Sequence, residues 1–290
     1  RPNGGDGGAK HRRREHPVKL AVLGSGSSGN AILVRGGRTT VLVDAGFSAR
    51  ELERRLRMVG FEAHDVHAVV VTHDHGDHTR GVGVFARRHG TPVYMTERTR
   101  DACNGLLRGD EIVHPYRAGF PFAIGDLRVE PFITVHDAAD PVGVAVVDET
   151  TGLRVGVATD LGRPTAQIRH ALSGCDFLVL EANHDEGMLH TSAYPAAVKQ
   201  RIASSHGHLS NGAAASFAVE LAHPRLAGVV LAHLSGECNR PSLAERVVGE
   251  ALERAGWKGY LAVAGQSEPT ELLDVEALRI GNGPGQFTLL

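Results

Sequence analysis

Short apolar runs alternate with glycine-rich turns over the first part of the chain, a pattern typical of β-strands joined by tight loops. The runs predict strands at residues 19–23, 30–34, 40–43 and 68–71. This pattern begins at Val18, which therefore marks the start of the folded part of the chain.

The segment after the third strand predicts a helix, because its apolar residues recur at helical spacing. The apolar stripe consists of Leu52, Leu56 and Val59. Ser48, with Glu51 three residues later, forms a capping-box pattern at the start of the helix, and Gly60 favours its end.

Helical and extended patterns alternate along the rest of the chain. Helices are expected near residues 82–89, 96–107, 195–204 and 211–222, and from Ser242, where Glu245 completes a second capping-box pattern. Strands are expected at residues 92–95, 177–180, 228–232 and 260–263, and mostly strands precede residue 157 after the helix near 96–107. Both halves therefore consist of strands followed by helices, which predicts one layered α/β domain with two sheets inside and helices outside.

The two ends of the chain differ in composition from this folded part. Residues 1–16 are rich in glycine and arginine and contain almost nothing apolar, so we expect a disordered N-terminal tail. The last residues, which include Gly281, Gly283 and Gly285, are expected to be loosely structured.

Composition narrows the class of protein. The chain has 290 residues, of which 42% are hydrophobic and 22% charged, as is ordinary for a globular protein. No apolar stretch reaches the roughly 18 to 20 residues of a membrane-spanning helix, and the N-terminus lacks the apolar core of a signal peptide. The 3 cysteines are widely spaced, without a Cys-x-x-Cys pair, and indicate neither a disulfide framework nor a zinc ribbon. We therefore expect a cytoplasmic protein with no membrane partner.

Residues 24–29 read Gly-Ser-Gly-Ser-Ser-Gly and match the dinucleotide-binding fingerprint as a letter pattern. That fingerprint requires a helix next, whose N-terminus holds the pyrophosphate. Here residues 30–34 are mainly apolar and lead to another turn, so a hairpin loop is the better interpretation. Backbone amides of such a loop can still line a pocket.

Residues 73–78 read His-Asp-His-Gly-Asp-His and follow the apolar run at 68–71 directly. Histidines at positions i and i+2 after a buried strand can point both rings at one cation, while Asp77 and His78 face a neighbouring position. The alternative is a run of solvated polar residues, but it leaves the ordered spacing of the ligand-type side chains unexplained. The segment therefore predicts a site for two divalent cations.

One loop cannot complete two coordination shells, so the site needs further ligands. Three candidates follow apolar runs, where strands end at the edge of a sheet: His136, Asp160 and His233. Taken singly, each is compatible with a core histidine or a helix-capping aspartate.

These residues, in this order, resemble those of the metallo-β-lactamase superfamily from about residue 18 to about residue 263. The resemblance implies an αββα sandwich, a hydrolase domain over residues 17–290, with the site along one edge of the paired sheets. It implies one metal held by His73, His75 and His136, and a second held by Asp77, His78 and His233. Asp160 would bridge the two metals, and Asp44 would orient the metal-binding loop.

Within that superfamily, the chain departs from the antibiotic-degrading members, which have cysteine in place of Asp160, and from flavodiiron oxidoreductases, which have glutamate in place of His75. It is also too short for the large inserted domain of ribonuclease J and Artemis-like nucleases. The chain resembles the YycJ/WalJ-like exonuclease branch in its segments 23–30, 136–143, 181–185, 207–211 and 233–235. That resemblance implies a metal-dependent 5'-to-3' exodeoxyribonuclease acting on double-stranded DNA, with a role in DNA repair.

The expected chemistry is phosphodiester hydrolysis by a hydroxide shared between two cations about 3.5 to 4 Å apart. Asp77 and Asp160 would take part as metal ligands. His208 or His184 would contact the phosphate or protonate the leaving oxygen, although each is equally compatible with a structural role. Nitrogen and oxygen ligands without thiolate suit zinc, manganese or iron.

Two alternatives remain beside a DNA substrate. The formal net charge of -2 gives no overall basic signature, so any phosphate-bearing partner must be held locally. This charge favours a small-molecule hydrolase of the same fold, which would cleave a cyclic phosphodiester, a thioester or a lactone. The other alternative is a metal-bound regulator without turnover.

Overall fold

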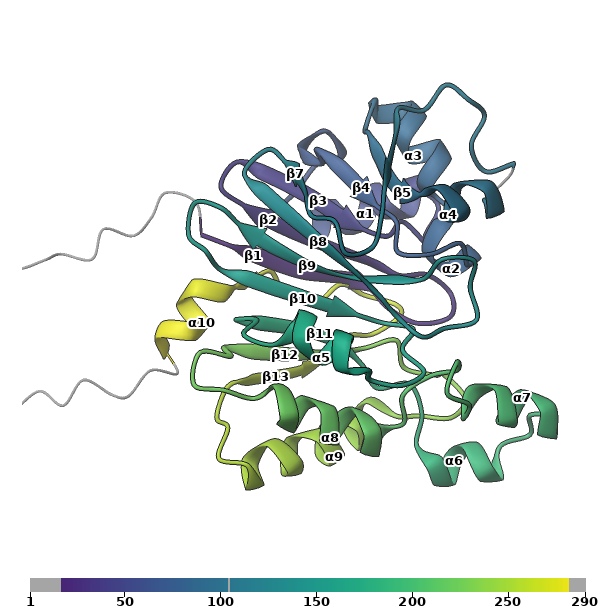
Figure 1. Ribbon diagram of the computed structural model, residues 1–290, viewed down its shortest axis with the longest axis vertical. Helices are drawn as coiled ribbons and strands as arrows, with labels where there is room; N and C mark the ends of the chain where they lie inside the picture. Colours follow the sequence, from purple (N-terminus) through teal and green to yellow (C-terminus); the bar gives the residue numbers. More distant parts are fainter. Residues whose placement is uncertain (1–16, 104, 282–290) are drawn as a thin grey trace, which may run out of the picture.

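Two seven-stranded sheets face each other in the computed structural model, which describes residues 17–103 and 105–281 (Figure 1). The first sheet consists, in spatial order, of β14 (Leu273–Asp274), β1 (Lys19–Gly24), β2 (Ala31–Gly36), β3 (Thr39–Val43), β4 (Ala68–Val70), β5 (Val93–Thr96) and β6 (Val113–Tyr116). The second consists of β13 (Tyr260–Val263), β12 (Gly228–Ala232), β11 (Phe177–Glu181), β10 (Arg154–Ala158), β9 (Val142–Asp148), β8 (Leu127–Ile133) and β7 (Phe122–Ile124). The prediction of a layered α/β domain with two inner sheets is confirmed.

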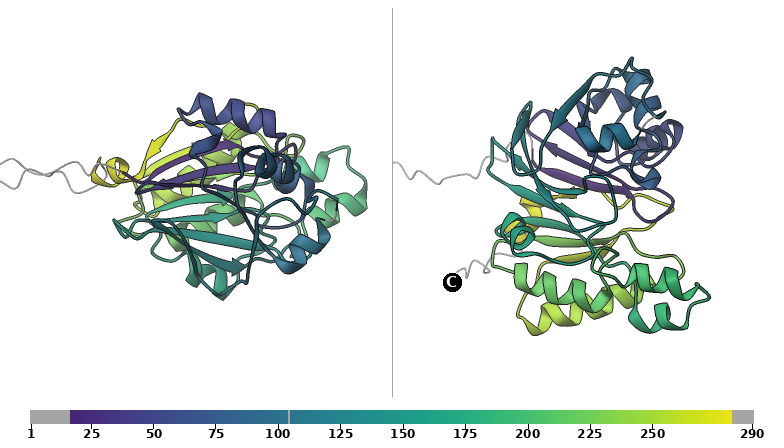
Figure 2. Two further views of the ribbon diagram at one scale, coloured as in Figure 1. Left: turned by 90° about the horizontal axis from the view of Figure 1, so that it is seen from above. Right: turned by 45° about the vertical axis from the view of Figure 1, so that its right-hand side comes forward.

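Helices lie outside the sheets or in the loops at their edges (Figure 2). On the side of the first sheet they are α1 (Ala49–Met58), the 3-10 helix η1 (Ala63–Asp65), α2 (Gly76–Thr79), α3 (Val82–His89) and α4 (Glu97–Ala102). The later helices are α5 (Ala166–Leu172), α6 (Glu186–Thr191), α7 (Ala196–Ile202), α8 (Asn211–Leu221), α9 (Pro241–Arg254) and α10 (Val275–Gly281).

Each sheet is antiparallel on one side and parallel on the other. Strands β1 to β3 form antiparallel pairs and β3 to β6 parallel pairs, whereas β7 to β10 are antiparallel and β10 to β13 parallel. Parallel strands end at the same edge of their sheet, where loops gather and sites form. In Figure 1, α2, which follows β4, and α6 and α7, which follow β11, lie at the end of the sandwich opposite to the two ends of the described chain.

Three apolar clusters fill the spaces between the layers. One lies between the two sheets and includes Val43, Val155 and Phe177. The second packs α5, α8 and α9 against the second sheet, and the third packs α1 and α3 against the first. Leu52 and Leu56, predicted to form the buried stripe of α1, are 0% exposed in the third cluster, and burying each such side chain contributes roughly 1.5–3 kcal/mol.

Several details differ from the expected elements. The helix expected near residues 96–107 is limited to Glu97–Ala102. The predicted capping box at Ser242 is wrong, because Pro241 occupies the first turn and the helix begins there without a side-chain cap. At α1, Ser48 Oγ accepts the Glu51 N–H at 3.3 Å as expected. The Glu51 carboxylate, however, binds Arg54 and Arg55 instead of the cap backbone.

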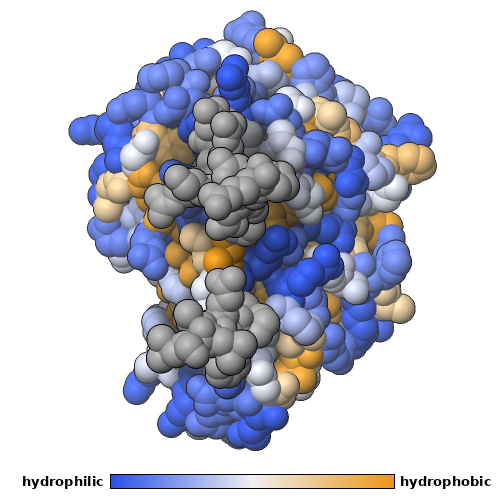
Figure 3. All heavy atoms as spheres, turned by 90° about the vertical axis from the view of Figure 1, so that its left-hand side faces the viewer, coloured by the Kyte–Doolittle hydropathy of each residue, from blue (hydrophilic) through white to orange (hydrophobic). Residues whose placement is uncertain are grey.

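The predicted disordered tail at residues 1–16 lies outside the described residues, as do Gly283 and Gly285. Gly281 ends α10, so the expected loose structure is wrong at that position. Among the described residues, no helix combines the length and apolar character that crossing a membrane requires. Figure 3 shows the face near the two ends of the described chain, where hydrophilic residues predominate and apolar ones appear between and beside the grey segments.

Candidate metal centre

The segment with the His-x-His-x-Asp-His pattern lies at the edge of the first sheet, where it follows β4 and runs into α2. Its position depends on a close approach to the loop after β3. A Cβ added to Gly46 would lie 1.6 Å from the carbonyl oxygen of Asp77, so only glycine fits there. The same Asp77 oxygen accepts the Asn30 N–H at 2.7 Å. Two neighbouring loops therefore hold the metal-binding pattern in place.

The predicted ligand residues come together at this edge. His73, His75 and His136 form one group, and Asp77, His78 and His233 form another; within each group the ligand atoms lie within 4.8 Å of one another. Asp160 joins a third group with His73 and His78.

Asp160 lies between the two triads. Its Oδ2 is 3.1 Å from His78 Nε2, and its Oδ1 is 3.6 Å from His136 Nε2. One carboxylate thus approaches a histidine of each triad.

The second ring nitrogen of four of these histidines has a partner away from the cluster. His73 Nδ1 lies 3.0 Å from Thr72 Oγ1. His78 Nδ1 lies 2.7 Å from Asp44 Oδ2, and Asp44 also accepts hydrogen bonds from the backbone and hydroxyl of Thr72. His136 Nδ1 lies 3.1 Å from the carbonyl oxygen of Gly207. His233 Nδ1 lies 3.0 Å from Glu181 Oε1. Such contacts orient a ring so that Nε2 faces the metal position.

Buried atoms without a hydrogen bond mark the same place. Within the described residues, the buried side-chain atoms without such a partner are His73 Nε2, Asp160 Oδ2, His184 Nδ1 and His233 Nε2. Leaving a polar group buried and unpaired costs roughly 1–3 kcal/mol. Because the atoms of His73, Asp160 and His233 belong to the ligand groups, bound cations would satisfy all three, and the donor set fits divalent metal ions.

Backbone conformation is unusual at the same edge. The non-glycine residues with positive φ in the described chain are Asp44, Asp160 and His233, with φ of 64°, 55° and 54°. Asp44 follows β3, Asp160 follows β10 and His233 follows β12. This left-handed conformation is uncommon outside glycine, and it recurs at functional sites where the surroundings hold it in place.

The electrostatics of the cluster favour positive charge. Burial alone would raise the pKa of Asp160, but His233 and His78 hold it well below its ordinary value. Burial opposes charge on His233 too, yet Asp160 and Asp77 raise its pKa to about 10. Burial together with the neighbouring His78 lowers the pKa of His73 well below its usual range. A carboxylate-rich, buried cluster of this kind attracts either protons or divalent cations.

Glu181 is a site residue that the sequence analysis missed. It ends β11 and its side chain is 0% exposed. Its Oε2 accepts the N–H groups of Leu161 and Leu209 at 2.9 and 3.0 Å, and its Oε1 lies 2.7 Å from His208 Nδ1 and 3.0 Å from His233 Nδ1. Burial raises its pKa, but His208 and His233 outweigh burial and bring it to about 2. The signal in the sequence was a carboxylate directly after the apolar run at 177–180, the position type that identified Asp160.

The two other predicted catalytic histidines lie in different surroundings. His208 lines the cavity at the cluster, and its ring centroid lies 5.1 Å from that of His136 and 5.2 Å from that of His233. His184 is buried, does not line this cavity, and its backbone pairs with Ser210. The structure therefore places His208 in the lining of the cavity at the cluster, whereas His184 is not part of that lining.

The cavity at the cluster has a volume of about 330 Å³. Its lining includes Ser27, Asp137 and Arg201 in addition to the predicted ligands. Ser27 belongs to the loop between β1 and β2, so the glycine-rich segment is the expected hairpin and contributes to a pocket.

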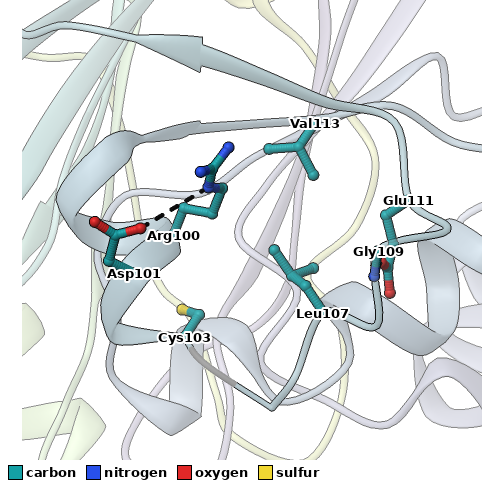
Figure 4. A pocket seen from close by; sticks show the side chains of 7 residues that line it. All are labelled: Arg100, Asp101, Cys103, Leu107, Gly109, Glu111 and Val113. Atoms are coloured by element: carbon teal, nitrogen blue, oxygen red, sulfur yellow. Dashed lines mark hydrogen bonds and ion pairs between the residues drawn. The ribbon is translucent and has the colours of Figure 1, made fainter.

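A second cavity, of about 680 Å³, lies beside α4 and is shown in Figure 4. Arg100 and Asp101 lie 4.0 Å apart at its rim. Burial raises the pKa of the Cys103 thiol in its wall to about 11, which leaves the thiol protonated. None of its lining residues belongs to a metal-ligand group found among the described residues. The chemistry is therefore concentrated in the smaller cavity.

This fold and donor set are those of metal-dependent hydrolases. A family model described as "Beta-lactamase superfamily domain" matches residues 39–233, and the chain belongs to that superfamily. The family and the histidine/aspartate cluster together indicate divalent metal ions. The expected superfamily and fold are confirmed.

The relatives within the superfamily include nucleases. The chain is 34% identical over 246 residues to the exodeoxyribonuclease YycJ of Bacillus anthracis, a match that covers 83% of this chain and 91% of the relative. It is 32% identical over 241 residues to the exodeoxyribonuclease WalJ of Streptococcus pneumoniae, covering 82% and 89%. Among solved structures, the metallo-β-lactamase fold protein YhfI from Bacillus subtilis superposes with a TM-score of 0.68 at 17% identity and covers 88% of this chain and 100% of that one. The resemblance to the YycJ/WalJ-like branch is confirmed.

Proposed function

We propose that this protein is a binuclear metal-dependent phosphodiester hydrolase and acts as a 5'-to-3' exodeoxyribonuclease on double-stranded DNA. The observation that carries the proposal is the position of Asp160 between two triads of ligand-type side chains. The relatives named exodeoxyribonucleases, which match most of the chain, support the substrate class.

In this proposal each triad holds one divalent ion. His73, His75 and His136 would hold the first, Asp77, His78 and His233 would hold the second, and Asp160 would be available to both. When bound, two such ions act as Lewis acids, lower the pKa of water to roughly 7 and neutralise charge on the phosphoryl oxygens.

The remaining residues orient these ligands and move a proton. Asp44 fixes the ring of His78, and Glu181 fixes the ring of His233, because each carboxylate contacts the Nδ1 atom. Glu181 also holds His208 through Nδ1, which leaves Nε2 as the nitrogen for substrate. His208 then protonates the leaving oxygen, which is a general acid role.

The test begins with purified full-length protein, metal analysis, and incubation with 5'-labelled duplex DNA, single-stranded DNA, RNA and a chromogenic phosphodiester. We expect metal-dependent shortening of duplex DNA from its 5' ends, with mononucleotides released from the start of the reaction. Internal cuts, or products from the 3' end, would contradict the proposed polarity.

Asp160→Asn tests the shared ligand. Asparagine tolerates the left-handed backbone at this position, so the fold and the far-ultraviolet circular dichroism should persist. Bound metal and turnover should fall together, by at least about a hundredfold in activity. The exposed Asp101→Asn is the matched control. Full activity with full metal content in Asp160→Asn would refute the bridging role.

A small-molecule hydrolase is the second candidate, because the net charge is -2 and the cavity measures only about 330 Å³. It predicts rapid cleavage of a cyclic phosphodiester, thioester or lactone with no processing of DNA. The regulator alternative predicts metal binding without turnover on any of these substrates; metal-dependent hydrolysis that His75→Ala abolishes would exclude it.

A further inference from the structure

The helix α7 is unusual among the helices described, because none of its residues is buried. It adds nothing to the apolar core, yet it lies beside the candidate metal centre. In Figures 1 and 2, α6 and α7 protrude from the sandwich at the end where α2 also lies. A segment without buried residues next to the site therefore suggests a role toward substrate rather than toward folding.

Arg201, near the end of α7, faces this site. It lines the cavity together with His75, Asp77 and His208. The Arg201 side chain is exposed, and its guanidinium forms neither a hydrogen bond nor an ion pair with the part of the chain that the structure describes. By contrast, Arg55 and Arg154 each bind a carboxylate and a backbone carbonyl. Arg201 is thus a cation left without a partner at the rim of a carboxylate-rich cavity.

Backbone packing fixes the position of Arg201. A Cβ added to Gly207 would lie 2.2 Å from the carbonyl oxygens of both Arg201 and Ile202, so the end of α7 packs directly on this glycine. The next N–H, of His208, donates to Ile202 O at 2.9 Å, and Gly207 O lies 3.1 Å from His136 Nδ1. The backbone that carries Arg201 is therefore coupled to a predicted ligand and to His208.

We propose that Arg201 is a positioning residue that binds a backbone phosphate of a polynucleotide next to the phosphodiester that is cleaved. The inference rests on the proposed function and names the group that recognises a polymer. A guanidinium binds phosphate through two parallel N–H groups, which gives orientation as well as affinity. With a net charge of -2, the protein has no bulk attraction for a polyanion and needs such a local contact.

The test compares wild type, Arg201→Gln and Arg201→Lys with the control Arg225→Gln. Arg225 is also exposed, and its side chain has no ion pair in the described part, but it precedes β12 at the edge opposite to His233. The first readout is the dissociation constant of a fluorescent 5'-phosphorylated duplex, measured by anisotropy in EDTA over a range of salt concentrations. The second is steady-state hydrolysis of duplex DNA and of bis(p-nitrophenyl) phosphate, which has a single phosphate.

Arg201→Gln should weaken duplex binding about tenfold or more and reduce the slope of log affinity against log salt by about 1. In hydrolysis, KM for duplex DNA should rise by a larger factor than KM for the single-phosphate ester. Arg201→Lys should recover part of the binding, because lysine keeps the positive charge but lacks the two parallel N–H groups of the guanidinium. Arg225→Gln should match wild type.

Two results would overturn the inference. One is a duplex dissociation constant for Arg201→Gln equal to that for Arg225→Gln. The other is an equal rise in KM for duplex DNA and for bis(p-nitrophenyl) phosphate. Failure of the proposed function is distinguishable from these results. It would appear as wild-type protein that hydrolyses no DNA, whereas a binding loss confined to Arg201→Gln would still support the phosphate contact. A wild-type protein that does not bind the duplex would refute both.

Discussion

The two sheets contribute to the candidate metal centre in different ways. The first sheet supplies most of the candidate ligands from one segment, residues 73–78, which follows β4. The second sheet supplies single residues at or just after the ends of separate strands: His136, Asp160, Glu181 and His233. A contiguous loop can be recognised as a ligand pattern on its own, but scattered residues acquire meaning only when parallel strands bring their ends to one edge.

The regions also differ in what supports them. Asp44 contacts one histidine of the first-sheet loop, whereas Glu181 contacts His208 and His233 together. In both regions a glycine allows two backbone segments to approach closely. Gly46 packs on the 73–78 segment of the first sheet, and Gly207 packs on the end of α7. Disturbing matched pairs of these residues tests whether the second region controls proton transfer as well as metal binding.

The largest expected effect comes from His208→Gln. Loss of a general acid lowers kcat for duplex DNA by about 10²- to 10⁴-fold, with metal content retained. His184→Gln, the matched variant behind the site, should change kcat only slightly, because His184 does not line the cavity. Steady-state measurements of kcat with both variants, together with metal analysis, check this difference. Equal losses for the two variants would show that the cavity lining does not identify the proton donor.

Glu181→Gln and Asp44→Asn should have intermediate effects. Loss of a carboxylate that orients a metal-binding histidine lowers metal affinity or activity about 10- to 100-fold. We expect the larger loss from Glu181→Gln, since it disturbs His208 as well as His233. Metal dissociation constants and kcat for both variants test the order. A larger kcat loss in Asp44→Asn would reverse our assignment of proton transfer to the second region.

The smallest expected change is in stability. Gly46→Ala places a methyl group 1.6 Å from Asp77 O, so the loop must move, at a cost of roughly 1–3 kcal/mol. Gly212→Ala in α8 meets nothing closer than 3.9 Å and should stabilise the protein by roughly 0.5–1 kcal/mol. Urea denaturation of both variants measures these changes. An unchanged midpoint for Gly46→Ala would mean that the loop adjusts freely and is not held by this contact.

Helices and strands were predictable where the local pattern of apolar residues matches the side chains that are buried in the folded protein. The stripe of Leu52 and Leu56 marks α1, and the apolar run at 228–232 coincides with β12. Predictions failed where one residue overrode a pattern, as Pro241 did for the capping box at Ser242. The candidate site followed the same rule: a dense local motif was visible, whereas Glu181 was overlooked because a lone carboxylate after an apolar run has many explanations.

Local order along the chain was sufficient to predict the alternating strands and helices, the loop of ligand-type residues and the superfamily, because each depends on neighbours in sequence. Only the folded chain could decide that Asp160 lies between the triads, that Glu181 holds two histidines, and that Arg201 rather than His184 reaches the cavity. These are contacts between distant segments, and they depend on sheet register and backbone packing, which place strand ends within a few ångströms of each other.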